Sequence, residues 1–287
     1  MTSRAVTVIL TIALLAWVGP AGATPFFFST GDVDGKIGTA SRPSSAGKVE
    51  IETGDDFVVS GGTLNLTSAT FQGLLPSASP LSNVSQVVVE IYRVFPRDSN
   101  DPPSGNVPTR VNSPSDVAFA SGDSSAGTLT FLPGIGAASF TTANSVLNGI
   151  NKSPNQTTLG EGPMTGERVQ FNVVFTTPIS LPADHYFFVP QVQLGSGDFF
   201  WLSAPRPIVA PGTSFAPDLQ SWIRNENLDP DWLRIGTDIV SGTTFNAAFT
   251  LSGDLELEPV PEPATLALLG TTMAGLGAAV WRRRRER

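Results

Sequence analysis

Residues 243–258 read TTFNAAFTLSGDLELE, and this stretch decides the fold class of the chain. Its apolar residues recur at alternate positions from Phe245 to Leu257, with polar, acidic or small residues between them. Successive side chains of a strand point to opposite faces, so this period of two predicts a half-buried β-strand. The turn-forming residues Ser252, Gly253 and Asp254 interrupt the pattern, which predicts a hairpin hinged there.

The same period recurs along most of residues 24–258, for example in RVQFNVVF (168–175) and SQVVVEIYRVF (85–95). Pro190 cannot donate to a ladder, so its strand is expected at a sheet edge or at a bulge. Residues 143–150 and 219–226 are expected to form short helices. The prediction is one all-β domain, an antiparallel β-sandwich of the jelly-roll or lectin-like type.

Composition excludes several kinds of chemistry. The chain has no cysteine, so disulfides, thiolate metal sites and a cysteine nucleophile are ruled out. The formal net charge is −8 at pH 7, although five arginines stand in the last six residues. An acidic body repels phosphate backbones, so no nucleic-acid partner is expected.

Residues 1–23 have the features of a signal peptide. Arg4 precedes an uncharged apolar stretch over residues 5–18, which ends before Gly19 and Pro20. The triplet that follows places small residues, Ala21 and Ala23, where the signal peptidase requires them. The sequence therefore predicts export and cleavage after Ala23.

A second apolar segment lies near the other end of the chain. Residues 264–281 carry no charge, and as a helix they would span about 27 Å, the thickness of a bilayer core. The arginines that follow favour the cytoplasm by the positive-inside rule. We therefore predict a single transmembrane helix over 264–281 and a basic cytoplasmic tail over 282–287, with residues 24–258 outside the cytoplasm.

Residues 259–287 combine a Pro-Glu-Pro triplet, a hydrophobic helix and an arginine cluster, in that order. This arrangement resembles the PEP-CTERM sorting signal, although an ordinary stop-transfer anchor behind a proline-rich spacer is an alternative. The resemblance implies that a membrane-embedded exosortase is a partner and that the protein reaches the cell surface or an exopolysaccharide matrix. The residues it assigns to the signal are Pro261, Glu262, Pro263, Arg282, Arg283, Arg284 and Arg285. On this basis we expect an exported, non-enzymatic surface or matrix protein.

Two acidic segments are candidate calcium sites. The first places Asn225, Asn227, Asp229 and Asp231 at alternate positions of one loop. Oxygen ligands spaced in this way can converge on a hard cation, although the loop lacks the central glycine of an EF-hand. The second candidate has Asp32 and Asp34 before a glycine. Both segments are also what ordinary turns are made of, so calcium is only a possible cofactor.

Three tryptophans suggest an alternative function as a carbohydrate-binding module. Trp201, Trp222 and Trp232 lie in or near predicted loops, where their rings could stack on sugars. Aromatic residues are also frequent in protein cores, and the sequence leaves both interpretations open.

A secreted hydrolase is a further alternative, but the sequence provides no catalytic residues for it. Adjacent residues of a strand point to opposite faces, so Asp55 and Asp56 cannot flank one bond. Glu50 and Glu52 share a face, which we interpret as a solvated strand face. His185 is the only histidine, and no nucleophile motif accompanies it, so we expect it to be satisfied by a neighbouring side chain.

Overall fold

The computed structural model describes residues 23–76, 80–102, 105–150 and 157–257, together with Arg282 and Arg285. Within these residues, no helix is both long enough and apolar enough to cross a membrane. The predicted transmembrane helix lies outside them. So do most residues of the two predicted targeting signals, namely Ala21, Pro261, Glu262, Pro263, Arg283 and Arg284.

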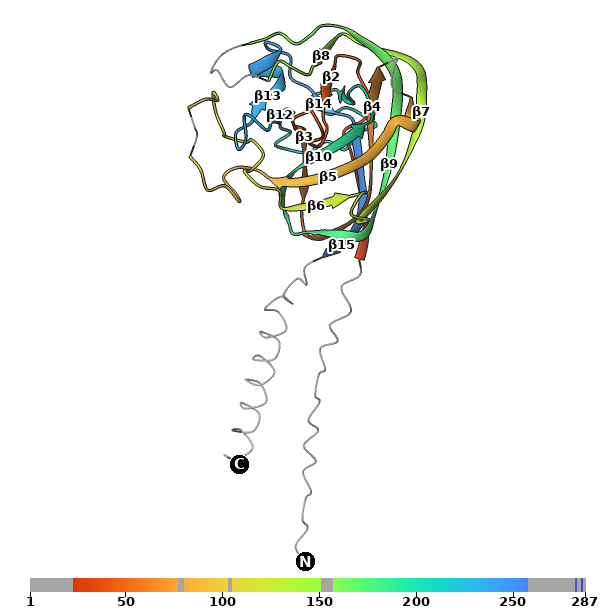
Figure 1. The fold of residues 1–287 in the computed structure, drawn as a ribbon. Helices are drawn as coiled ribbons and strands as arrows, with labels where there is room; N and C mark the ends of the chain where they lie inside the picture. The colour runs from red at the N-terminus through yellow and green to blue at the C-terminus, as the bar shows by residue number, and fades with distance from the viewer. Residues whose placement is uncertain are drawn as a thin grey trace, which may run out of the picture. The chain divides into compact units, whose positions relative to one another are not determined.

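The compact unit of Ala23–Glu258 is built from two β-sheets, which confirms the predicted all-β fold (Figure 1). The first sheet runs in the order β1 (Ala23–Ser29), β15 (Phe249–Leu257), β4 (Gly62–Pro76), β11 (Phe200–Ala204), β2 (Ile37–Ala40) and β8 (Asn144–Val146), with β9 (Met164–Leu181) beside β4, β7 (Leu129–Thr142) beside β9, and β14 (Asn246–Ala247) against β11. The second sheet runs in the order β13 (Leu233–Arg234), β12 (Trp222–Asn225), β3 (Ile51–Val59), β10 (Asp184–Leu194), β5 (Val84–Arg93) and β6 (Ala120–Asp123). Two short helices, η1 (Leu81–Asn83) and η2 (Ile235–Ile239), complete the described elements.

The last strand of the unit differs from the predicted hairpin. β15 is continuous, pairing with β4 on one side and β1 on the other, and its register shifts between Ser252 and Gly253. The turn-forming residues therefore make a bulge. Gly253 is needed there, because a Cβ at this position would lie 2.2 Å from the backbone oxygen of Asn65.

Pro190 lies in a central strand, so the predicted edge position is wrong for β10 as a whole, whereas the alternative of a bulge is confirmed by the register shift between Gln193 and Leu194. β10 pairs with both β3 and β5, but its pairing with β3 ends at Phe188. Pro190 therefore has one strand neighbour, β5, where it lies opposite Val89. The proline is tolerated because β10 has no strand partner on its other side at this position, where a ladder would need a backbone N–H donor.

The two predicted short helices are also wrong. Residues 143–150 contain β8, which pairs in parallel with β2, and residues 219–226 contain β12, which pairs with β3 and β13. Helices of this length are marginal in isolation, so the pairing partners available in the folded chain decide the conformation.

The main core lies between the two sheets and is rich in phenylalanine. Phe71 of β4 and Phe171 of β9 stack with their ring centroids 5.0 Å apart, and the ring of Phe199 meets both of them edge-on. The second sheet contributes Val89 and Ile91 of β5 to the same cluster. The first sheet thus packs face to face with the second, as in a β-sandwich.

Both ends of the unit lie in one ladder. β1 is antiparallel to β15, with Ala23 opposite Glu256 and Thr24 opposite Leu255 (Figure 1). The chain therefore enters and leaves the unit at the same end of the first sheet.

We expect Phe171→Ala to lower the free energy of unfolding by about 3–5 kcal/mol, because a fully buried ring is lost from the phenylalanine cluster. Leu132→Ala on the neighbouring strand β7 is the matched control, since Leu132 is 70% exposed and its truncation leaves no cavity. Denaturant unfolding of both variants checks the prediction. Equal effects of the two changes would contradict the placement of this core.

Candidate functional site

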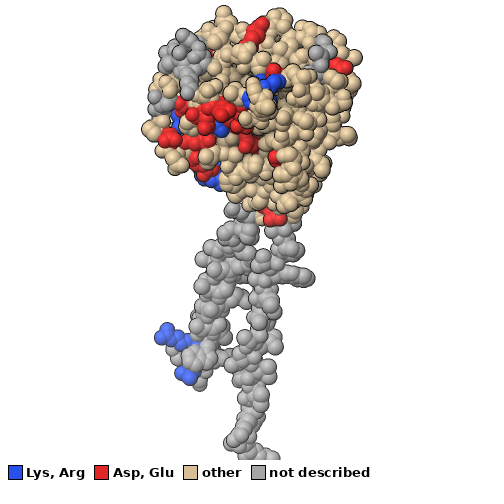
Figure 2. Space-filling model, viewed as in Figure 1, with Lys and Arg blue, Asp and Glu red and all other residues tan. Residues whose placement is uncertain are grey.

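Acidic side chains gather on one face of the unit, near β3 and β12 (Figure 2). They surround a pocket of about 270 Å³ on the outer face of the second sheet, opposite the face that packs on the core. Its lining contains six carboxylates and one guanidinium, from Glu50, Glu52, Glu90, Tyr92, Asp116, Val117, Ala118, Arg224, Glu226 and Asp229. This composition favours an uncharged or basic ligand over an anionic one.

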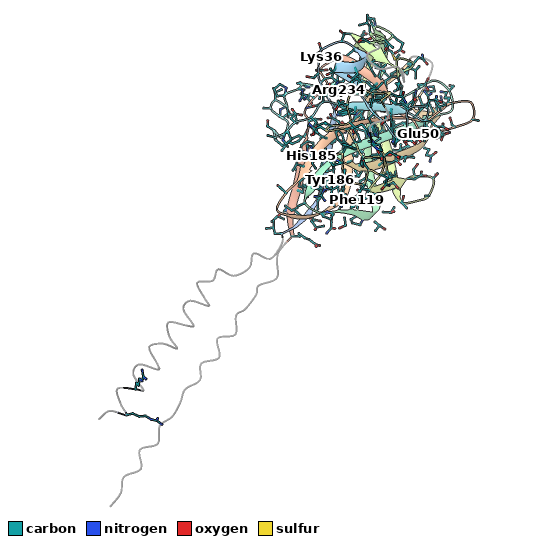
Figure 3. All side chains as sticks on the ribbon, turned by 90° about the vertical axis from the view of Figure 1, so that its left-hand side faces the viewer. Lys36, Glu50, Phe119, His185, Tyr186 and Arg234 are labelled. Atoms are coloured by element: carbon teal, nitrogen blue, oxygen red, sulfur yellow. The ribbon has the colours of Figure 1, made fainter. Side chains whose placement is uncertain are left out.

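A second hollow of about 560 Å³ adjoins the acidic pocket. It is lined by Arg93, Asp98, Ser99, Asn100, Val117, Ala118 and Phe119. Val117 and Ala118 line both hollows, so the two are adjacent, and we call them together the groove. Figure 3 labels one residue from each hollow, Glu50 and Phe119. The guanidinium of Arg93 lies over the Phe119 ring, 4.1 Å from its centroid.

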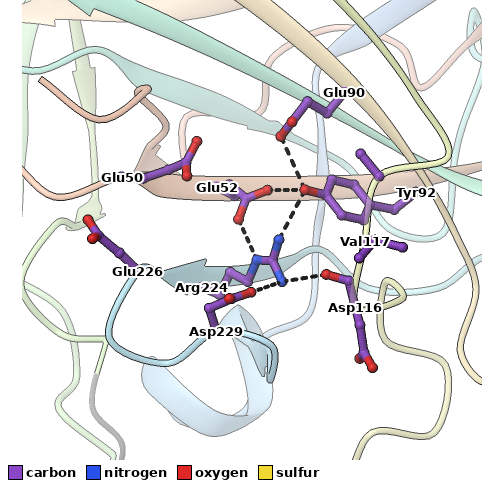
Figure 4. A pocket seen from close by; sticks show the side chains of 10 residues that line it. Glu50, Glu52, Glu90, Tyr92, Asp116, Val117, Arg224, Glu226 and Asp229 are labelled. Atoms are coloured by element: carbon purple, nitrogen blue, oxygen red, sulfur yellow. Dashed lines mark hydrogen bonds and ion pairs between the residues drawn. The ribbon is translucent and has the colours of Figure 1, made fainter. Parts of the chain in front are cut away.

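Strand alternation explains how the acidic pocket acquires its side chains. On β5, Val87, Val89 and Ile91 face the core, so Glu90 and Tyr92 point outward. β3 and β12 contribute Glu52 and Arg224 to the same outer face, and a loop that includes Asp116 covers its edge (Figure 4). The floor of the pocket is therefore built on strands, while its rim comes from loops.

Glu52 is the most constrained acid in the pocket. It is 4% exposed, and each of its carboxylate oxygens has a donor. One oxygen pairs with Nε of Arg224, and the other accepts a hydrogen bond from the Tyr92 hydroxyl at 2.5 Å. A buried carboxylate is tolerated when it is paired with a guanidinium and hydrogen-bonded in this way.

Arg224 connects the floor of the pocket to its rim. Besides Glu52, its guanidinium pairs with Asp229 at 2.6 Å and donates to the backbone oxygen of Asp116 at 3.2 Å. It also stacks on the indole of Trp232, 4.4 Å from the ring centroid. Burial alone would lower the pKa of Arg224, but the charge of Glu52 outweighs it and raises that pKa above its usual value.

Glu90 differs from Glu52 in its protonation. Burial, assisted by the negative charge of Glu52, raises the pKa of Glu90 to about 8. Its carboxyl oxygen lies 3.2 Å from the Tyr92 hydroxyl, whose single hydrogen is the one that bonds Glu52. The Tyr92 hydroxyl can therefore donate to Glu90 only in place of Glu52, and a hydrogen bond between Glu90 and Glu52 adds to the rise of the Glu90 pKa. The pocket therefore holds a neutral carboxyl beside an ion-paired carboxylate at neutral pH.

The three tryptophans proposed for sugar stacking lie in the core, so their ring faces are not presented to solvent. Trp201 packs among Phe188 and Phe249 and donates to the backbone oxygen of Ala248. Trp222 and Trp232 belong to a buried cluster behind the acidic pocket, where Trp232 supports Arg224. This burial confirms the core interpretation of the three tryptophans and removes them as candidates for stacking on sugars.

The structure does not gather the first candidate calcium loop around one point. Asp229 pairs with Arg224, whereas Asp231 is buried against Arg110 at 3.3 Å. The side-chain oxygen of Asn225 accepts from the backbone of Asn227, as in an Asx turn. Arginines thus take the place that a cation would have.

In the second candidate loop, other groups of the protein already bond the side chain of Asp34. Asp34 accepts from the backbone of Lys36 and from the hydroxyl of Ser203. Across the described residues, no group of three or more histidine, cysteine, aspartate or glutamate side chains is placed to hold a metal ion.

Asp55 and Asp56 are structural, and both are fully buried. Asp55 accepts from the Ser221 hydroxyl at 2.9 Å. Asp56 lies 2.6 Å from Nε2 of His185, which confirms that the histidine is satisfied by a neighbour. Burial raises the pKa of both aspartates and lowers that of His185 to about 4. These groups hold the segment around Leu219 against β3.

Sequence reasoning overlooked the centre of the pocket. Glu52 does not lie on a solvated face, because Arg224 and the covering loop bury it. Glu90 and Tyr92 were visible only as the polar side of an alternating strand. A useful signal was present, since the polar faces of two strands both carried glutamates, but nothing in the chain showed that these strands share a sheet.

We expect Glu90 to contribute a loss of stability as the pH rises from about 5 to 8, and Glu90→Gln to remove this contribution. The pKa of Glu90 is near 4.5 when unfolded and about 8 when folded, so between these values the folded state binds more protons. Raising the pH then favours unfolding. Denaturant unfolding at pH 5 and pH 8 measures the slope. An unchanged slope in Glu90→Gln would show that Glu90 is not protonated in the pocket.

We further expect Arg224→Met to destabilise the fold by about 3–5 kcal/mol, because it leaves Glu52 buried without its cation. The double variant Arg224→Met/Glu52→Gln should recover much of that loss, since the uncompensated charge is gone. Thermal or denaturant unfolding of both proteins measures the coupling. Additive effects would mean that the two side chains do not interact.

Comparison with protein families gives one match, the PEP-CTERM protein-sorting motif, over residues 259–285. The match does not extend into residues 24–258. Neither the curated proteins nor the solved structures contain a match to the chain. The resemblance identified from the Pro-Glu-Pro triplet and the arginine cluster is thereby confirmed, and the motif indicates an exported protein that an exosortase sorts to the cell surface.

Proposed function

We propose that the protein is a component of the cell surface or extracellular matrix and that it binds a polysaccharide in the groove. The observation that carries this proposal is the groove itself, two adjacent polar hollows at the outer face of a sheet in a protein that the sorting motif directs out of the cell. Exopolysaccharide is the macromolecule to which such a protein has most direct access.

The chemistry of the groove suits a chain of sugars. Carboxylates and the Asn100 side chain can bond hydroxyl groups, and Phe119 offers an apolar surface beside them. The surplus of carboxylates opposes polymers that carry uronate, sulfate or phosphate groups. The expected ligand is therefore a neutral or amine-bearing polysaccharide.

The arrangement of the chain ends agrees with display at a surface. Ala23 begins β1 and lies opposite Glu256 of β15, so the signal peptide and the sorting motif join the same end of the unit. The motif begins two residues after Leu257. We propose that a membrane helix over 264–281 holds the chain until the exosortase acts.

Binding should not require calcium. Asp229 and Asp231, the carboxylates of the first candidate loop, already have arginine partners, and the groove presents a hydroxyl-binding surface without a metal. EDTA is expected to leave both the melting temperature and polysaccharide binding unchanged, as measured by thermal unfolding and pull-down. If EDTA abolished binding and added calcium recovered it, the result would show that calcium is a cofactor.

We expect the full chain, purified in detergent, to bind insoluble cellulose or chitosan and not calcium-crosslinked alginate. Val117→Arg should weaken binding by about tenfold or more, which is about 1.4 kcal/mol, because it fills the junction of the two hollows. Val111→Arg is the matched control, since Val111 is 66% exposed, close in sequence and outside the lining. Pull-down isotherms on the three polymers check these outcomes.

Binding to alginate alone, or equal losses in the two arginine variants, would contradict the proposed site. Absence of binding to all three polymers and to the host's own exopolysaccharide would contradict the proposed function.

A further inference from the structure

We propose that the outer face of the first sheet binds a second copy of this chain, so that two copies pair face to face about a two-fold axis. The strands that form this face are β7, β9, β4, β15 and β1, in that spatial order. The groove belongs to the second sheet, so this inference is independent of the proposed function.

The strand registers show which residues share this face. One row across the five strands, from β7 to β1, consists of Thr130, Val174, Ser68, Ser252 and Phe27. The next row consists of Leu132, Asn172, Thr70, Thr250 and Ser29. A third and shorter row consists of Gly134, Gln170 and Gln72. None of these positions is charged, although 15% of the chain is, and we call the three rows the uncharged face.

Apolar side chains are exposed at both borders of the uncharged face. On β1, Phe28 lies in the core and Phe26 packs against it, so Phe27 between them points outward and is 61% exposed. At the opposite border Leu132 on β7 is 70% exposed, and Val174 on β9 is 54% exposed. In Figure 2, few charged atoms appear on the side where Figure 1 places β7 and β9.

Charge favours a second copy as the partner at this face. The chain has a formal net charge of −8, so two copies repel each other in most orientations. The repulsion is weakest where the two uncharged faces meet. Depletion of charged residues is also what distinguishes the centre of a protein–protein interface from the rest of a protein surface.

The arrangement of the apolar residues makes the face complementary to itself. A two-fold axis parallel to the strands and passing over β4 reverses the order of the strands but keeps the rows, so β1 of one copy lies over β7 of the other. Phe27 of each copy then meets Leu132 and Val174 of the other, and this contact occurs twice. Thr70 lies near the axis and faces its own counterpart across two sheets about 10 Å apart.

The polar groups between the two borders already bond to one another. The hydroxyls of Thr70 and Thr250 are 2.6 Å apart, and the side chain of Gln170 donates to that of Asn172 at 2.9 Å. A second copy that covers these groups therefore leaves few of them without a partner. Their bonds also hold the side chains in place before association, which reduces the entropy that binding costs.

The size of the face indicates a weak dimer. Five strands about 4.8 Å apart and three rows about 6.8 Å apart cover roughly 500 Å² per copy, or about 1,000 Å² in total, the low end of specific interfaces. The proposed axis leaves the chain ends of both copies at the same end, because β1 and β15 lie in the face. Two chains attached side by side to one surface have a high effective concentration, at which a weak contact is sufficient.

The first test maps the contact by cross-linking. The chain has no cysteine, so single cysteines in the full chain, purified in detergent, are specific sites for a short bismaleimide. Thr70→Cys should form cross-linked dimers, whereas Phe27→Cys alone should not, because its two copies lie about 19 Å apart at opposite borders. A mixture of Phe27→Cys and Leu132→Cys should cross-link again. Val111→Cys, at a position that is 66% exposed and outside the face, measures random collision.

The second test disrupts the contact. In the Thr70→Cys protein, the added pair Leu132→Lys/Val174→Lys should lower the cross-linked fraction about tenfold, because the dimer would bury lysines without partners. The matched control is Val111→Lys/Leu159→Lys, which adds the same charge at positions that are 66% and 60% exposed and lie outside the face. The melting temperature of each variant shows whether it has folded.

Equal cross-linking of Thr70→Cys and Val111→Cys would overturn the inference, and so would cross-linking that the Leu132→Lys/Val174→Lys pair leaves unchanged. A dimer detected by light scattering that cross-links neither through Thr70→Cys nor in the Phe27→Cys and Leu132→Cys mixture would also overturn it, since another surface would then hold the copies together. The Leu132→Lys/Val174→Lys pair should leave polysaccharide pull-down unchanged, so that failure of the dimer and failure of the proposed function are separate results.

Discussion

The burial of acidic side chains along β3 is the constraint on which the rest of this structure depends. Glu52, Asp55 and Asp56 are all buried, and an unpaired buried carboxylate costs several kcal/mol. Each therefore draws a donor from elsewhere in the chain. Asp55 and Asp56 take the backbone amides of Ala247 and Leu219, and Glu52 takes Arg224. The segment between β11 and β15 contains only the short elements β12, β13, η2 and β14, and these bonds hold it on the second sheet together with the β12–β3 ladder.

The acidic pocket is a consequence of the same arrangement. Once Arg224 is held by Glu52, it pairs with Asp229 and donates to the backbone of Asp116, which brings two loops to the rim of the sheet. Glu90 then stands in a partly enclosed space beside a charge of its own sign, which favours its protonated form. Thus the contacts that stabilise the loops also create the difference in protonation between the two glutamates.

The sequence predicted the strands well, but it did not predict which distant segments cover them, and the reason is physical. Period-two patterns such as the one in β9 report which side chains share a face, and the all-β fold follows from them. They do not report which face a distant loop covers, so Glu52 resembled a solvated residue until Arg224 was seen beside it. In the sequence, Gly253 likewise resembles a turn residue. In the structure it lies at a bulge of β15, and the strand continues through this position because β1 and β4 pair with it on either side. The sorting motif could be recognised from the sequence because it is defined by the succession of residues along the chain and not by tertiary contacts.

The position of the carboxyl pair argues that it is more than a way of attaching loops. The same outer face of the sheet carries Phe187 and Val189, which with Trp222 form an apolar cluster that holds the covering segments without any charge. A buried ion pair is often no more stable than apolar side chains of the same size, so extending that cluster would have served attachment as well. Instead, Glu52 and Glu90 converge on the buried hydroxyl of Tyr92 at the floor of the pocket, and Glu90 contributes nothing that the pairing of Glu52 with Arg224 requires. Attachment of the covering loops therefore does not by itself explain why a carboxyl group occupies that position.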